Sequence, residues 1–229
     1  MLRALDRNIW VADGPPVSFM TVPYPTRMLA VRLRGGELWV CSPIGLSEAL
    51  RREVAALGEP AHIVSPNKLH HLYLGEWAEA WPGARLWAPP GLKRRRRDLD
   101  FNDQLGDIAP GDWADDIDQT VVGGSIAMAE VVFFHRSSAT LFIADLVQKF
   151  DPATLGPFQR FIMAADGMLG PKGSTPREWR ASFLRRSAAR AAVRRAIGWQ
   201  PRRLILAHGP IIEEDVPEVL RASFAWLRV

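Results

Sequence analysis

Three short apolar segments of this chain are each followed by side chains that can bind a metal ion. The pairs are residues 63–65 with His70 and His71, residues 141–144 with Asp145, and residues 204–207 with His208. Apolar runs of this length are typical of buried β-strands. Because strand ends are rigid, they can hold such side chains in one shared cleft. The sequence therefore predicts a site built from three distant parts of the chain.

The elements around these segments predict an α+β fold. Two hairpins are expected, one joining residues 28–33 to 38–41 and one joining residues 126–135 to 140–144. Further short strands are expected at residues 9–12, 62–65, 85–88 and 204–207, and helices at residues 47–57, 72–81, 176–197 and 216–227. We expect one domain over residues 1–229, a four-layer αββα sandwich of two mixed sheets with helices on both outer faces. A doubly wound parallel sheet is the alternative, which the two hairpins disfavour.

The remaining segments are expected to be irregular. A proline-rich turn is expected around Pro23 and Pro25. Loops at residues 14–27, 91–118 and 151–175 match no motif that we can interpret, and we expect them to set substrate specificity.

Composition indicates how the chain is stabilised and whether it enters a membrane. Apolar residues make up 48% of the 229 residues, and nine are Trp, so a core can form without disulfides. Cys41, the one cysteine, lies in an apolar run and is expected to be a small buried residue rather than a catalytic thiol. No apolar run approaches the ~18–20 residues that span a bilayer, and no apolar signal core is visible. We therefore expect a soluble cytoplasmic protein without a membrane partner, and the oligomeric state stays open.

The formal net charge of +4 comes from clustered arginines. Arg186, Arg190 and Arg194 fall four residues apart, so they share one face of a predicted helix. A solvated face is the expected role, and a phosphate- or nucleic-acid-binding face is the alternative. No nucleic-acid-binding module accompanies these residues, so a nucleic-acid partner is not expected.

The order of strands and ligands resembles the metallo-β-lactamase superfamily, over about residues 9–208. Its hallmark is an apolar strand followed by H-x-H-x-D-H, which falls here on residues 66–71, Pro-Asn-Lys-Leu-His-His. The superfamily's later aspartate falls on Asp145, and its final histidine falls on His208. The chain is most similar to a branch of the superfamily with a degenerate motif. The resemblance implies a metallo-β-lactamase-like sandwich and a metal-dependent hydrolase.

The departures from the hallmark imply that at most one metal ion binds. Pro66 and Lys68 replace two histidines of the superfamily's first site, and its third would fall near Ser125 or Ile126. The resemblance leaves a second site of four ligands, which are His70, His71, Asp145 and His208. Three imidazoles and a carboxylate suit one divalent ion, with zinc first and iron or manganese as alternatives.

Lys68 and Asp145 are the candidate catalytic residues. The Lys68 ammonium could take the place of the lost ion and hold a substrate anion, it could pair with Asp145, or it could point into solvent. Counting along the second hairpin places Glu130 opposite Asp145, so Glu130 is a second-tier candidate for the rim of the cleft. His135 falls at the far end of that hairpin and is expected to be structural.

Two functions fit these observations. The first is a metal-dependent hydrolase acting on a small molecule, for which an anion is one option. The second is a non-catalytic binding or structural module that kept the fold and lost the metal. An open cleft at the ligands would favour the first, and side chains filling the cleft would favour the second.

Overall fold

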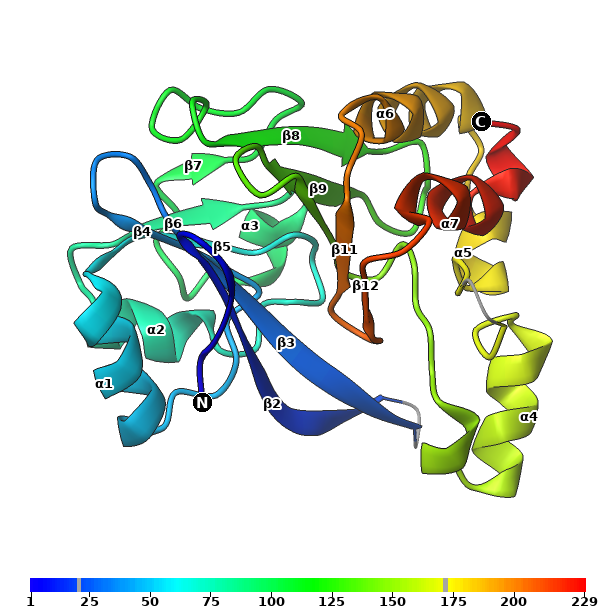
Figure 1. The fold of residues 1–229 in the computed structure, drawn as a ribbon, viewed down its shortest axis with the longest axis horizontal. Helices are drawn as coiled ribbons and strands as arrows, with labels where there is room; N and C mark the ends of the chain where they lie inside the picture. Colours follow the sequence, from blue (N-terminus) through cyan, green and yellow to red (C-terminus); the bar gives the residue numbers. More distant parts are fainter. Residues whose placement is uncertain (20–21, 171–172) are drawn as a thin grey trace.

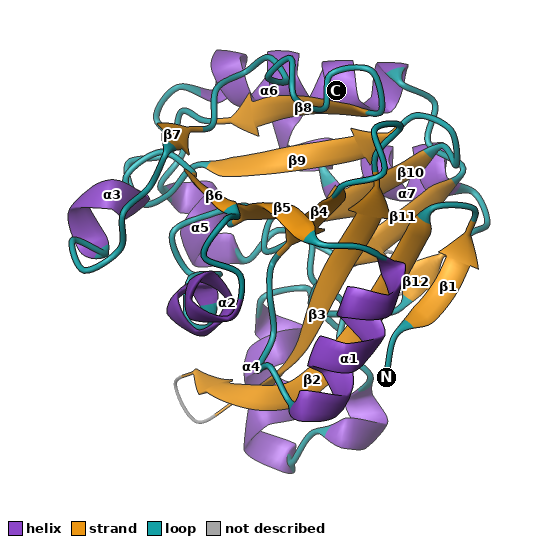
Figure 2. Ribbon diagram, turned by 90° about the vertical axis from the view of Figure 1, so that its left-hand side faces the viewer, coloured by secondary structure: helices purple, strands orange, loops and turns teal. Residues whose placement is uncertain are grey.

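Two β-sheets face each other, and helices cover the outer face of each (Figures 1 and 2). The structure is a computed structural model that describes residues 1–19, 22–170 and 173–229. Both sheets contain parallel and antiparallel pairs. The predicted αββα sandwich is confirmed, and the doubly wound parallel sheet is excluded because of the antiparallel pairs.

The first sheet has seven strands that follow one another in chain order. They are β1 (Arg3–Asp6), β2 (Ile9–Phe19), β3 (Val22–Arg32), β4 (Leu38–Cys41), β5 (Pro60–Val64), β6 (Arg85–Ala88) and β7 (Asp103–Gln104). Strands β1 to β4 are antiparallel, and β4 to β7 are parallel. The predicted turn between β3 and β4 contains Gly36 at a φ of 96°, a left-handed conformation that favours glycine.

The second sheet has five strands in the order β12, β11, β10, β9, β8. Their bounds are β8 (Ile117–Val122), β9 (Glu130–His135), β10 (Thr140–Ile143), β11 (Arg203–Leu206) and β12 (Ile211–Ile212). Strands β10 and β11 are parallel neighbours, paired from Thr140 with Arg203 to Ile143 with Leu206. Their carboxyl ends therefore meet at one edge of the sheet, which brings the residues that follow them together.

Seven helices and two short 3₁₀ turns complete the described residues. The helices are α1 (Glu48–Leu57), α2 (Leu74–Ala80), α3 (Leu92–Arg95), α4 (Pro157–Ala165), α5 (Arg177–Ala181), α6 (Arg186–Gly198) and α7 (Val216–Ser223), with 3₁₀ turns at Pro152–Thr154 and Ala225–Leu227. Helix α1 begins as its sequence predicts, because the Ser47 hydroxyl accepts a hydrogen bond from the Leu50 N–H. None of the described helices is long and apolar enough to cross a membrane.

Three apolar clusters hold the four layers together. The space between the sheets is filled by large aromatic side chains from both, including Trp39, Trp87, Phe133 and Phe142. Helices α1 and α2 pack on the outer face of the first sheet, and α5, α6 and α7 pack on the outer face of the second. Cys41 is fully buried and burial raises its thiol pKa, in agreement with a structural role.

Several sequence expectations about local structure are wrong. Residues 14–19 and 22–27 are strands rather than a loop, since β2 and β3 pair from Ile9 with Val31 to Phe19 with Val22, and residues 20 and 21 of the expected loop lie outside the described residues. Pro23 and Pro25 therefore lie in a strand rather than a turn. The helix expected at residues 176–197 is two helices, separated where residues 182–185 leave the helical path. Strands β1, β7, β8 and β12 and helices α3 and α4 have short or weakly periodic sequences and were not predicted.

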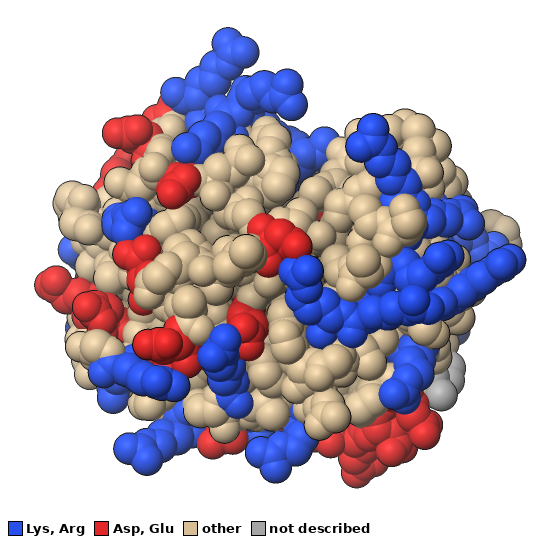
Figure 3. All heavy atoms as spheres, turned by 90° about the horizontal axis from the view of Figure 1, so that it is seen from above, with Lys and Arg blue, Asp and Glu red and all other residues tan. Residues whose placement is uncertain are grey.

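The arginines of α6 bind the carboxyl-terminal segment. Lys and Arg side chains gather on the face that α6 covers (Figure 3). Arg190 and Arg194 donate hydrogen bonds to the carbonyl oxygens of Leu227 and Arg228, and the Arg186 guanidinium lies 5.9 Å from the ring centre of Trp226. These contacts give the three arginines a structural role in addition to solvation.

Candidate metal centre

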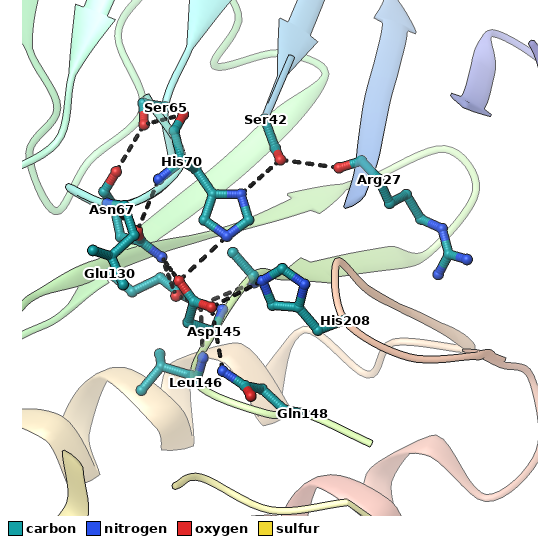
Figure 4. A network of polar contacts seen from close by, with 12 residues as sticks. Arg27, Ser42, Ser65, Asn67, His70, Glu130, Asp145, Leu146, Gln148 and His208 are labelled. Atoms are coloured by element: carbon teal, nitrogen blue, oxygen red, sulfur yellow. Dashed lines mark hydrogen bonds and ion pairs between the residues drawn. The ribbon is translucent and has the colours of Figure 1, made fainter. Parts of the chain in front are cut away.

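Three of the side chains that follow strands meet at one point between the two sheets. The Nε2 atom of His70 lies 3.2 Å from Oδ2 of Asp145, and the Nε2 atom of His208 lies 3.0 Å from Oδ1 (Figure 4). One ligand atom from each of the three residues lies within 4.8 Å of the other two. His70 follows β5 of the first sheet, whereas Asp145 and His208 follow β10 and β11 of the second. The site therefore depends on how the two sheets are packed.

Hydrogen bonds to the other ring nitrogens fix which histidine atoms carry hydrogen. The Ser42 hydroxyl donates to the carbonyl oxygen of Arg27, so it must accept a hydrogen bond from Nδ1 of His70 at 2.8 Å. Nδ1 of His208 lies 2.6 Å from the carbonyl oxygen of Pro25, which can only accept. Each neutral ring therefore carries its hydrogen on Nδ1 and a lone pair on Nε2.

Both lone pairs would then point at the same carboxylate. Lone pairs of nitrogen and of an ionised carboxylate repel each other at about 3 Å, so the arrangement needs positive charge between them. Two protonated imidazoles would supply that charge, and so would one metal cation bound to both Nε2 atoms and to Asp145. A histidine that donates Nδ1–H to an oxygen while Nε2 faces the ion is the usual pattern of metal-binding histidines.

Asp145 is held as a carboxylate by its surroundings. Burial by itself raises the pKa of Asp145, but the charges and hydrogen bonds of His70 and His208 in their protonated forms outweigh it and hold the pKa far below its usual range. Two amide groups also donate to the carboxylate, Asn67 to Oδ2 at 2.7 Å and Gln148 to Oδ1 at 3.2 Å. Each oxygen of the Asp145 carboxylate therefore accepts a hydrogen bond from one amide side chain.

Glu130 lies directly behind Asp145, as the sequence predicts. Its carboxylate accepts the backbone N–H groups of Ala144, Asp145 and Leu146 at 3.0, 2.8 and 3.3 Å, and the Asn67 amide at 2.8 Å. Burial raises the pKa of Glu130 to about 8, and repulsion from Asp145 adds to the rise, whereas these donors oppose it. Glu130 is fully buried and does not line the cavity. It therefore does not lie at the rim of the cleft, where the sequence placed it, and instead holds Asp145 from behind.

The segment after β5 decides which of the two adjacent histidines enters the site. The side-chain oxygen of Asn67 accepts the N–H groups of Leu69 and His70 at 2.8 and 3.4 Å, which makes a tight turn. The Ser65 hydroxyl lies 2.7 and 2.9 Å from the carbonyl oxygens of Asn67 and His70. This turn directs the His70 ring toward Asp145.

His71 is held by contacts with Arg96 instead of with Asp145. Its Nδ1 atom lies 3.1 Å from the Arg96 guanidinium, which also donates to the His71 carbonyl oxygen at 2.8 Å. Because arginine can only donate, Nδ1 of His71 accepts and its hydrogen is on Nε2. Burial lowers the pKa of His71, and the charges of Arg95 and Arg96 lower it further, which favours the neutral ring. The structure thus brings together His70, Asp145 and His208 and leaves His71 out of that group.

A cavity of about 470 Å³ opens above the three ligands, a volume typical of small-molecule sites. His70, Asp145 and His208 all line it, and so does Lys68. Lys68 is half-buried, and the described residues give it neither a hydrogen bond nor an ion pair with Asp145. Of the three roles considered for Lys68, the structure therefore does not show the salt bridge to Asp145.

The family model described as "Domain of unknown function (DUF4336)" matches residues 7–207. This chain belongs to the DUF4336 family. No curated protein matches the chain.

Solved structures similar to this DUF4336 chain are metallo-β-lactamases. VMB-1 at pH 5.5 has a TM-score of 0.69 at 10% identity, covering 100% of this chain and 98% of the other. DIM-1 metallo-β-lactamase exposed to ceftazidime has a TM-score of 0.68 at 14% identity, covering 99% and 96%. The metallo-β-lactamase from Pontibacter korlensis has a TM-score of 0.67 at 12% identity, covering 100% and 98%. The DUF4336 chain therefore has a metallo-β-lactamase-like fold, and these identities show the fold alone.

Three residues of this DUF4336 site were missed by the sequence analysis. Asn67 and Gln148 hold the Asp145 carboxylate, and Ser42 holds the His70 ring. Asn67 lies inside the segment that resembles the hallmark, so its position was a usable signal. Ser42 follows a buried strand and precedes a proline, and only the pairing of β4 with β5 brings it near His70.

Proposed function

We propose that this DUF4336 chain is a metal-dependent hydrolase that binds one divalent ion through His70, Asp145 and His208. The observation that carries the proposal is the orientation of the two histidines. Each donates Nδ1–H to a protein oxygen and presents Nε2 to the same buried carboxylate. Two nitrogen lone pairs and a carboxylate oxygen at this spacing fit the ligand set of a transition metal.

Zinc is the first candidate for the ion, because two imidazoles and a carboxylate are a common set of protein ligands in catalytic zinc sites. Iron and manganese are the alternatives, since two histidines and one carboxylate also suit them. When bound, the ion would supply Lewis acidity for the hydrolysis of an acyl or phosphoryl bond. His71 is not part of the proposed ligand set, because its contacts with Arg96 leave hydrogen on Nε2.

The other residues of the site have positioning roles in this proposal. Ser42 and the Pro25 carbonyl hold the two imidazoles in one tautomer, and Asn67 and Gln148 hold Asp145. Lys68 lines the cavity and has no carboxylate partner in the part of the chain that the structure describes, so its ammonium is available for negative charge on a substrate.

One ion fits this site better than two. Neither of the positions considered for the third histidine of the superfamily's first site provides a ligand. Ser125 hydrogen-bonds to Ser182, and the Ile126 side chain is 76% exposed. The Asn67 amide, which bridges Glu130 and Asp145, places hydrogen atoms rather than lone pairs beside the carboxylate.

A non-catalytic module is the second candidate, and the cavity argues against it. In such a module, side chains would be expected to fill the cleft, whereas a cavity of about 470 Å³ lies over the three ligands. The volume suits a small molecule, and the similar DIM-1 enzyme was studied with ceftazidime. We therefore propose a small-molecule substrate.

Hydrolysis assays with and without metal test this function. The protein would be freed of metal with a chelator, reloaded with Zn²⁺, Fe²⁺ or Mn²⁺, and assayed on ceftazidime and on panels of esters, thioesters, amides and phosphoesters. We expect turnover of at least one class only after reloading, and about a 100-fold or greater loss in Asp145→Ala. Metal-loaded protein that hydrolyses none of these compounds, or turnover that Asp145→Ala retains, would contradict the proposal.

A further inference from the structure

The cavity over the metal centre is asymmetric in charge. Lys68 and Arg95 line it from the side of the first sheet, Lys68 after β5 and Arg95 at the end of α3. Neither forms an ion pair with a carboxylate among the described residues, whereas the adjacent Arg96 pairs with Asp98 at 2.7 Å. Free cations at the wall of a ligand cavity favour an anion, because the ligand would provide the missing partner.

The wall on the side of the second sheet is apolar. Met128 precedes β9, and Trp179 lies on α5 and donates a hydrogen bond to the Met128 carbonyl oxygen at 3.4 Å. Tyr24, from β3 of the first sheet, also lines the cavity, and its ring lies edge-on to His208 with the ring centres 5.1 Å apart. Glu178 on α5 also lines the cavity from this side, and its carboxylate would repel an anion. A negatively charged group of a ligand is therefore expected near Lys68 and Arg95, and its apolar part near Met128 and Trp179.

We infer that the substrate is a small amphipathic anion, with a negatively charged group beside Lys68 and Arg95 and an apolar group against Met128 and Trp179. The inference rests on the proposed function, because the ligand is taken to be the molecule on which the metal centre acts. His70, Asp145 and His208 line the same cavity as these two sets of residues, so a ligand that contacts both sets lies beside the metal centre. A bond in the middle of the molecule would then lie over the centre.

Binding of simple probes to metal-free protein tests the inference. Isothermal titration calorimetry would compare octanoate, 1-octanol and acetate, and the absence of metal prevents the carboxylate from binding to an ion. We expect octanoate to bind at least about fivefold more tightly than 1-octanol, because the charge adds one or two ion pairs. Acetate should bind more weakly than either, because it has almost no apolar surface. Added NaCl should weaken the binding of octanoate and leave that of 1-octanol nearly unchanged.

Matched variants locate the two ends of the ligand. The double variant Lys68→Met, Arg95→Met should reduce the affinity for octanoate to that for 1-octanol, whereas Arg94→Met, on the same helix but outside the cavity, should not change it. Met128→Gln should weaken both probes by about three- to fivefold, and the exposed Ile126→Gln should weaken neither.

The outcomes separate this inference from the proposed function. Equal affinity for octanoate and 1-octanol, or octanoate binding that survives the double variant, would overturn the inference even if the protein binds metal and hydrolyses esters. Charge-dependent binding of octanoate by a protein that takes up no metal would support the amphipathic ligand and overturn the hydrolase.

Discussion

Replacing His208 or His70 with alanine is expected to weaken zinc binding by more than about 100-fold, whereas His71→Ala should leave it within about threefold. Each of the first two changes removes one of three ligands from a site whose geometry depends on both sheets. His71 is bound to Arg96 and presents no lone pair to the centre. Competition with a fluorescent zinc chelator would give the affinities, and circular dichroism would show that each variant is folded.

The His71→Ala variant is the informative control, because the sequence places His70 and His71 side by side. Comparable loss of zinc affinity in His70→Ala and His71→Ala would mean that both imidazoles bind the ion. The turn at Asn67 would then have to open in the loaded protein. Retention of zinc by His208→Ala would remove the proposed ligand set.

Glu130→Ala is expected to lower the free energy of unfolding by about 3–5 kcal/mol in metal-free protein. The change leaves three backbone N–H groups and one of the two N–H groups of the Asn67 amide without an acceptor in a fully buried place. Glu130→Gln should cost less, because it keeps the volume and one oxygen. Urea unfolding followed by circular dichroism measures these differences.

Glu213→Ala is the matched control for this loss. Glu213 is exposed and pairs with Arg203 at 2.7 Å, so its removal should cost less than about 1 kcal/mol. If Glu130→Ala were no more costly than Glu213→Ala, the four hydrogen bonds to Glu130 would not contribute to the stability of the site.

The strand-end residues of the site could be predicted because apolar runs mark buried strands. Asp145 and His208 follow such runs directly, and parallel pairing of β10 with β11 then brings them together. The position of Glu130 behind Asp145 followed from counting along a hairpin with a short turn. Local patterns therefore predicted those parts of the site that depend on strand register.

The choice between His70 and His71 could not be made from such patterns. Adjacent residues of a turn point in different directions. Here the side-chain oxygen of Asn67 accepts backbone N–H groups and the Ser65 hydroxyl donates to the His70 carbonyl oxygen, and these hydrogen bonds decide which histidine enters the site. Ser42 depends on the contact between β4 and the segment after β5, which no local sequence signal indicates. The pairing of residues 14–19 with residues 22–27 was missed for a similar reason, since prolines in that segment predict a turn but are tolerated in irregular strands.

The number of metal ions bound by the wild-type protein tests the central claim most directly. Protein purified without an affinity tag that binds metal would be stripped, titrated with Zn²⁺, dialysed and analysed by inductively coupled plasma mass spectrometry. The ligand set His70, Asp145 and His208 predicts one equivalent of zinc per chain, lost in Asp145→Ala. Two equivalents would show that a second ion binds despite the missing histidines, and no bound zinc, iron or manganese would show that the three residues form a hydrogen-bonded network instead of a metal centre.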